Sequence, residues 1–155
     1  MEPMTLAELG EPRVVDGAAL LIAGISGEYT QQTMSEIPKQ WDAINEVLDR
    51  LGAFPVATYG VVYRASPMRY VCGLEASKLA ALPEGWIEIE VPAQRYAVFG
   101  RDGGVEAIRS MWTGLWMNWV PANPGKLSDG PMVEFYAEQF GMGNDHFEIW
   151  LPLKS

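Results

Sequence analysis

The sequence predicts an α+β fold of two similar β-α-β-β units, related by a pseudo-twofold axis, with an antiparallel sheet and two helices on one face. Apolar residues recur at helical spacing in two segments, and they alternate with polar residues, as in half-buried strands, in several others. Both helical segments carry an Ile-x3-Trp-x2-aliphatic pattern, which begins at Ile37 and at Ile108. A Glu-Ile-x-aliphatic-Pro pattern also begins twice, at Glu88 and at Glu148. Two such units would leave a ligand cleft between them.

Length and composition predict a single domain over residues 1–155. The chain has 155 residues and 48% of them are hydrophobic, which is enough to bury a core. Its 16 glycines and 11 prolines indicate many turns between short elements. We therefore expect all the helices and strands described below to pack around one core.

The first unit is predicted to span about residues 13–92. Residues 13–27 are rich in Val, Ala, Leu and Ile, and they are expected to form a strand with a bend near Gly17. The apolar stripe of residues 37–51 has helical period and predicts a helix that Gly52 ends. The segments ATYGVVYR and RYVCGLEA are typical of a hairpin, and the alternation in WIEIEVP is that of a half-buried strand.

The second unit is predicted to span about residues 95–153. RYAVFGR is expected to be its first strand. The stripe from Ile108 to Trp119 predicts the second helix, which Val120-Pro121 should end. After the loop PANPGKLSDGP, the segments PMVEFYAEQF and HFEIWLPL are expected to be the closing strands.

The charge of the chain restricts its partners. A formal net charge of −9 argues against a nucleic-acid partner, because phosphates require a basic protein face, and against docking on anionic lipid. It favours cationic partners through electrostatic steering. No stretch is long and apolar enough to span a membrane, and the N-terminus does not resemble a signal peptide. We therefore expect a cytoplasmic protein with no nucleic-acid or membrane partner.

The sequence predicts neither a metal nor a cofactor. Cys72 and His146 are the only cysteine and histidine, and one of each cannot build a typical zinc site. No nucleophile elbow, P-loop or dinucleotide-binding glycine pattern is present. Cys72 lies in an apolar strand segment, which predicts a buried and inert thiol.

Three of the six tryptophans lie in the short run MWTGLWMNWVP, and two methionines lie among them. Aromatic rings can stack on a flat or cationic organic molecule, and methionine adapts its shape to a ligand. Trp112 lies on the apolar stripe and is expected to belong to the core, as is Trp41 on the stripe of the first helix. Trp116 and Met117 lie off that stripe and could line a cleft, and Trp119 could cap the pocket.

The strand PMVEFYAEQF supplies a candidate carboxylate. Side chains alternate along a strand, so Glu134 and Tyr136 share one face, and Val133 and Phe135 share the other. We expect Val133 and Phe135 to pack under the helices, and Glu134 and Tyr136 to face the cleft. A desolvated carboxylate there would select positive charge. The remaining candidates for ligand contact are Tyr63, Tyr96 and Trp150.

The chain resembles the GyrI-like small-molecule-binding domains, which also form the effector-binding half of many AraC- and MerR-type regulators. The matching segments are IPKQWDAI, YGVVYR, YVCGLEA, PEGWIEIEVPAQRYAVF, GLWMNWVP, DGPMVEFY and FEIWLPL. The resemblance implies duplicated β-α-β-β units, a ligand cleft between them and a carboxylate deep in that cleft, which matches Glu134. Because no helix-turn-helix precedes the first expected strand, the chain resembles a standalone member of the family.

Together, the resemblance and the candidate residues predict a protein that binds small hydrophobic, cationic organic molecules without enzymatic activity. One alternative is a metal-independent hydrolase of strained or electrophilic molecules, with Glu134 as general base and Tyr136 or Tyr63 as acid. Another is a protein inhibitor of the DNA gyrase-inhibitor type. A homodimer is also left open, and the sequence does not identify the ligand.

Overall fold

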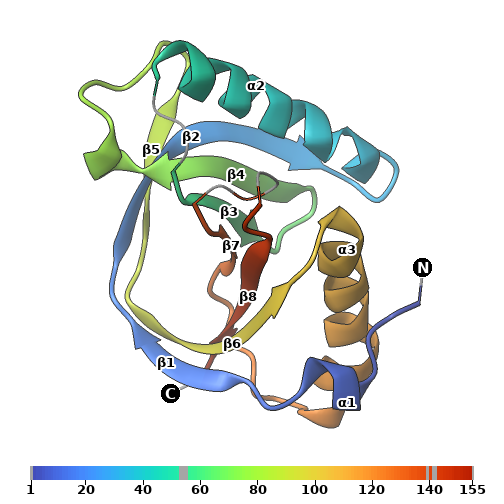
Figure 1. The fold of residues 1–155 in the computed structure, drawn as a ribbon. Coiled ribbons are helices and arrows are strands. Elements are labelled where there is room, and N and C mark those ends of the chain that lie inside the picture. The colour runs from blue at the N-terminus through green and yellow to red at the C-terminus, as the bar shows by residue number, and fades with distance from the viewer. Residues whose placement is uncertain (1, 53–55, 139, 141–142, 155) are drawn as a thin grey trace.

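The computed structural model describes residues 2–52, 56–138, 140 and 143–154, and it confirms the α+β prediction. Its eight strands form one antiparallel sheet in the order β1-β6-β8-β7-β3-β4-β2-β5 (Figure 1). The elements of the first part of the chain are α1 (Leu6–Leu9), β1 (Arg13–Gly17), β2 (Leu20–Tyr29), η1 (Met34–Glu36), α2 (Ile37–Arg50), β3 (Thr58–Tyr63), β4 (Met68–Glu75) and η2 (Ala76–Lys78). Those of the second part are β5 (Ile87–Val91), β6 (Gln94–Asp102), α3 (Val105–Gly114), the π-helical turn η3 (Leu115–Trp119), α4 (Val120–Ala122), β7 (Met132–Tyr136) and β8 (His146–Leu153).

The sheet order shows the predicted duplication. In the first unit β4 lies between β2 and β3, and in the second unit β8 lies between β6 and β7. The two units meet where β3 pairs with β7, and each unit places its long helix after its first strand. This arrangement corrects one detail of the sequence pattern, because Glu88 lies in β5 whereas Glu148 lies in β8. The equivalent of β8 in the first unit is β4. The Glu-Ile-x-aliphatic-Pro pattern therefore occurs in two strands that are not equivalent in the duplication.

The two ends of the sheet are joined by one bent ribbon. Gly17 of β1 faces Gln94 of β6, and three residues further along, Leu20 of β2 faces Val91 of β5 in the same register. The chain bends between these pairs, close to the bend expected near Gly17. Figure 1 shows β1 running on into β2 and β5 running on into β6. As a result, the sheet curls back on itself and has an inner face as well as a face that carries the helices.

Two separate core clusters fill these faces. On the helix face, strand residues such as Phe147, Ile149 and Leu151 pack against α2 and α3, as expected from their alternation. The inner face is lined by residues such as Val61 and Val133, which are fully buried. Because the sheet buries apolar side chains on both faces, both clusters contribute hydrophobic stabilisation.

The second helix runs further than the sequence predicted. It was expected to end at Val120-Pro121, but α3 passes through η3 into α4, which ends at Ala122. Pro121 is the second residue of α4 and follows directly after the π-helical turn. The first long helix ends as predicted, since Gly52 after it has a φ of 66°.

Candidate functional site

The site is centred on Glu134, in the middle of β7. Its carboxylate lies on the helix face of the sheet, and the residue is only 8% exposed. The Tyr70 hydroxyl donates to Oε1 at 2.5 Å, and the Trp112 indole N–H donates to Oε2 at 2.6 Å. Tyr70 comes from β4 of the first unit and Trp112 from α3 of the second. The two units therefore meet at one carboxylate.

Gly60 makes the space for this contact. It faces Glu134 across the β3–β7 pair, and an ideal Cβ at residue 60 would lie 2.5 Å from Glu134 Oε1 and would also collide with the Tyr70 hydroxyl. A side chain there would occupy the volume in which the carboxylate and the phenol meet. Sequence reasoning missed this residue, although a glycine inside the strand segment YGVVY is a signal of close approach.

Tryptophans from equivalent positions of the two long helices converge on the site. Trp112 bonds the carboxylate directly, whereas the Trp41 indole N–H donates to the Tyr70 hydroxyl at 2.9 Å. The ring of Trp41 also packs edge-on against Tyr136, with centroids 5.4 Å apart. Both tryptophans were expected to belong to the core alone. The repeated Ile-x3-Trp pattern was the signal that could have identified them as a functional pair.

Gln40 fixes α2 above the sheet beside this pair. Its side-chain amide donates to the carbonyl oxygens of Ile25 at 2.8 Å and Tyr70 at 3.0 Å, and its oxygen accepts from the Tyr29 hydroxyl. A buried amide with each of these bonds made is a strong positional constraint. Gln40 therefore orients the backbone that carries Tyr70.

The environment of Glu134 opposes its charge. Burial raises the pKa of Glu134 above its usual range, and the hydrogen bonds from Tyr70, Trp112 and Tyr136 offset only part of that rise. Burial and the neighbouring Glu134 carboxylate likewise raise the pKa values of the Tyr70 and Tyr136 hydroxyls well above the usual value. Among the ion pairs of the described residues, none involves Glu134. The carboxylate is thus surrounded by neutral donors and aromatic rings.

The structure brings together only some of the predicted site residues. Tyr136 lies beside Glu134 as expected. The other candidates lie elsewhere. Trp119 is buried against Phe99, with centroids 5.3 Å apart, and Trp116 and Met117 are 41% and 61% exposed on η3. The rest are on the inner face, on the far side of the sheet from Glu134: Tyr63, Tyr96 and Trp150.

The expected orientation of β7 was wrong. Val133 and Phe135 were expected to pack under the helices, but they belong to the inner face with Trp150. Glu134 and Tyr136 lie under the helices instead, where they pair across the sheet with Ile149 and Phe147. The reason is the curl of the sheet. With apolar side chains on both faces, alternation separates the two sets of residues but does not tell which set the helices cover.

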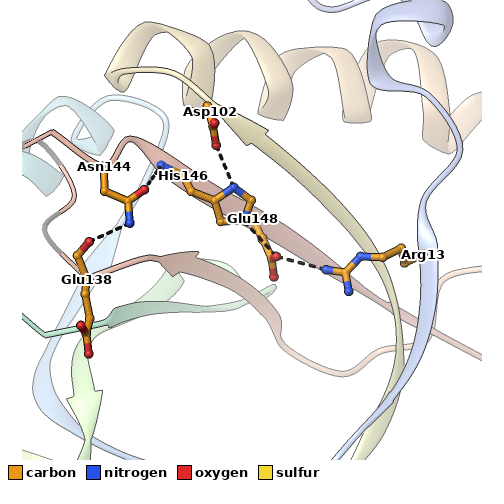
Figure 2. A network of polar contacts seen from close by, with 6 residues as sticks. All are labelled: Arg13, Asp102, Glu138, Asn144, His146 and Glu148. Carbon is orange, nitrogen blue, oxygen red and sulfur yellow. Dashed lines mark hydrogen bonds and ion pairs between the residues drawn. The ribbon is translucent and has the colours of Figure 1, made fainter.

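A second acidic cluster lies on β6 and β8, and Figure 2 shows it. Glu148 Oε2 accepts from Arg13 Nη2 at 3.1 Å and lies 3.1 Å from His146 Nε2, while His146 Nδ1 lies 2.9 Å from Asp102 Oδ1. Partial burial lowers the pKa of His146, but its bonds to Glu148 and Asp102 outweigh that effect and raise the pKa above the usual value. The side chain of Glu148 is 15% exposed and ion-paired.

Other features of the described residues add no ligating chemistry. No group of three His, Cys, Asp or Glu side chains among them could hold a metal. Cys72 is buried, and burial raises the pKa of its thiol to about 12, consistent with the predicted inert thiol. None of the described helices is long and apolar enough to cross a membrane. A hollow of about 230 Å³ has an uncharged lining: Tyr29, Thr30, Gln31, Met34, Ala65, Ser66, Pro67 and Met68.

Several solved structures share this fold. The structure of SAV2435 bound to tetraphenylphosphonium matches with a TM-score of 0.75 and 19% identity, over 94% of this chain and 95% of that one. An integron cassette protein of Vibrio cholerae matches with a TM-score of 0.69 and 16% identity, over 93% and 96% of the two chains. At these identities the likeness shows the fold alone.

Sequence comparison identifies the family. The transcriptional regulator BrlR of Pseudomonas aeruginosa is 25% identical over an alignment of 104 residues that covers 64% of this chain. The match spans 38% of the length of that regulator. The family described as GyrI-like small molecule binding domain matches residues 10–154, nearly the whole chain. The chain therefore belongs to the family of GyrI-like small molecule binding domains.

Proposed function

We propose that this domain binds small, hydrophobic organic cations at Glu134, between the two long helices and the sheet. The observation that carries the proposal is a buried carboxylate whose hydrogen-bond partners, Tyr70 and Trp112, are both uncharged. An ionised carboxylate without a cationic partner is costly in a low-dielectric interior. A bound cation would remove that cost, so the free energy of binding would include the relief of an unfavourable charge.

The rings around Glu134 suit such a ligand. Trp41, Tyr70, Trp112 and Tyr136 come from both helices and from both halves of the sheet, and they surround the carboxylate with aromatic faces and edges. Aromatic faces attract cations, and rings bury large apolar areas. A lipophilic cation would gain dispersion energy from the rings and charge pairing from Glu134. A neutral molecule of the same shape would gain only the dispersion energy.

Two comparisons support the proposal. The family is one of small-molecule binding domains, and the structure of SAV2435 with the same fold holds tetraphenylphosphonium, a lipophilic cation.

In the present chain the Glu134 carboxylate is closed in by its own hydrogen-bond donors. A ligand that pairs with Glu134 must therefore displace the Trp112 indole, the Tyr70 hydroxyl or both.

A titration with tetraphenylphosphonium tests the proposal. We expect binding by calorimetry and by a change in tryptophan fluorescence, since two of the surrounding rings are indoles. Triphenylphosphine oxide provides a neutral analogue of similar shape. Glu134→Gln should weaken binding of the cation at least tenfold and binding of the neutral analogue less than twofold.

Glu88→Gln is the matched control, because Glu88 is an exposed strand carboxylate on β5 and carries the same charge. This variant should bind both molecules as the unmodified protein does. Equal weakening of cation and neutral analogue in Glu134→Gln would reject charge selection by Glu134. Failure of the unmodified protein to bind lipophilic cations at all would reject the proposal.

Hydrolysis is the second candidate function, and one observation favours it. Glu134, whose pKa burial raises, stands beside two phenols, Tyr70 and Tyr136. A carboxylate with a raised pKa is a better general base, and a phenol could orient water or protonate a leaving group. Tyr63 lies on the opposite face and cannot take this part. Turnover of a strained electrophile that Glu134→Gln abolishes without loss of binding would establish catalysis.

A further inference from the structure

Residues 2–10, which we call the N-terminal strap, lie across α3 and η3 (Figure 1). The Met4 N–H donates to the carbonyl of Ser110 at 3.1 Å, and Asn118 Nδ2 donates to the Met4 carbonyl at 2.8 Å. The Ser110 hydroxyl donates to the carbonyl of Glu2 at 2.6 Å. Three hydrogen bonds therefore fasten the strap to the helix that carries Trp112.

The strap also packs against β6 and contains a short, capped helix. Met4 is 4% exposed, and its sulfur accepts from Nη1 of Arg101 at 3.3 Å, while Nη2 of Arg101 donates to the Glu8 carbonyl at 3.2 Å. Thr5 and Glu8 form a capping box that starts α1. These contacts make the strap an ordered segment with a defined docked position.

Gly114 permits the close approach between strap and helix. An ideal Cβ at residue 114 would lie 2.8 Å from the Met4 backbone nitrogen, and it would also collide with the Met4 carbonyl oxygen. A larger residue would force the strap away from α3. The glycine therefore brings the Met4 backbone into van der Waals contact with the helix.

The strap and Glu134 contact opposite sides of the same helix, α3. An α-helix turns about 100° per residue, so Ser110 and Gly114 point about 160° away from Trp112. Trp112 holds α3 to the sheet through Glu134, and the strap covers the far side. Movement of α3 away from Glu134 therefore breaks the strap contacts or carries the strap with it.

We propose that the docked N-terminal strap keeps the Glu134 site closed, and that ligand binding at Glu134 loosens the strap. The inference rests on the proposed function, and of the two donors on Glu134 it takes the Trp112 indole as the one that the ligand displaces. Linkage requires the coupling to be reciprocal. If ligand weakens strap docking by some factor, weaker docking strengthens ligand binding by the same factor.

Asn118→Ala tests the first direction. It removes one hydrogen bond from the strap and leaves the site residues in place, so we expect tetraphenylphosphonium to bind more tightly, on the order of fivefold. Thr113→Ala is the matched control, because the Thr113 hydroxyl is exposed and bonds only to a carbonyl of its own helix. In the other direction, saturating ligand should speed hydrogen exchange of the Met4 amide relative to the Val61 amide in the sheet.

Unchanged affinity in Asn118→Ala, with unchanged Met4 exchange on binding, would overturn the coupling. The binding function would then stand if Glu134→Gln still weakened binding of the cation at least tenfold. Trp112→Phe decides the coupling even without a ligand, since it removes the indole donor that holds α3. In the free protein it should speed Met4 exchange more than Val61 exchange. No change at Met4, or equal acceleration of both amides, would overturn the proposal.

Discussion

Two glutamates on neighbouring strands show that the same type of side chain has two different roles in this fold. Glu134 of β7 and Glu148 of β8 each accept a hydrogen bond from a tryptophan, at 2.6 Å from Trp112 and 2.9 Å from Trp150. They lie on opposite faces of the sheet. Glu148 pairs with the cationic Arg13 and contacts the titratable His146, whereas Glu134 has only uncharged partners among the described residues. A carboxylate that the fold neutralises belongs to the structure, and one that the fold leaves unneutralised is open to a ligand.

The largest expected effect is the pH dependence of cation binding. A cation pairs with the ionised form of Glu134, whose pKa burial raises above the usual range. Each pH unit below that pKa should therefore weaken binding about tenfold. Calorimetric titrations with tetraphenylphosphonium between pH 4 and pH 8 would measure the slope. A flat profile for the cation, matching that of the neutral analogue, would show that Glu134 does not pair with it.

Gly60→Ala should be the next largest effect. The new methyl group would occupy the space in which Glu134 and the Tyr70 hydroxyl meet, because an ideal Cβ there lies 2.5 Å from Glu134 Oε1. Overpacking of a buried site costs about 1–3 kcal/mol, so unfolding in urea should shift by about that amount. Gly100→Ala provides a comparison outside the site, since its Cβ would lie 3.4 Å or more from the nearest side-chain atoms, those of His146 and Glu148. Equal stability of Gly60→Ala and the unmodified protein would mean that the site is looser than the contacts indicate.

The strands and helices, and Glu134 itself, could be predicted from the sequence, but most of the surroundings of Glu134 could not. The period of residues 37–51 and the alternation in HFEIWLPL identified the elements, because local burial patterns fix helices and strands. The family resemblance pointed to Glu134. Tyr136 was predicted to lie beside Glu134, but Tyr70 and Trp41 were not, because Tyr70 reaches Glu134, and Trp41 reaches Tyr70, through contacts between distant parts of the chain. The face of the sheet on which Glu134 lies was also not predicted, because both faces of the curled sheet are apolar.

The stabilities of Glu134→Gln and Glu148→Gln should change in opposite directions above the raised pKa of Glu134. A carboxyl group with a raised folded-state pKa contributes stability below its unfolded pKa and loses it as pH rises through the folded pKa. Above its raised pKa, ionised Glu134 therefore destabilises the fold, and its replacement by the neutral Gln should stabilise it there. Glu148→Gln removes the bonds to Arg13 and His146 and should destabilise by about 0.5–1 kcal/mol. Urea unfolding of both variants from pH 5 to pH 8 measures the two signs, and a loss of stability in both would remove the contrast between the glutamates.

The smallest expected effect concerns His146, which ties Glu148 to Asp102. Its bonds to these two carboxylates raise its pKa, so the stability that it contributes is complete below about pH 6.5 and is lost as pH rises through the raised value. The side chain is 37% exposed and screened by solvent, which limits the contribution to a few tenths of a kcal/mol. The stability difference between the unmodified protein and His146→Gln should therefore shrink from pH 6 to pH 8 and should shrink further in high salt. A difference that stays constant over this range would show that charge on His146 does not support the Glu148 cluster, and Arg13 would then be its main counter-ion.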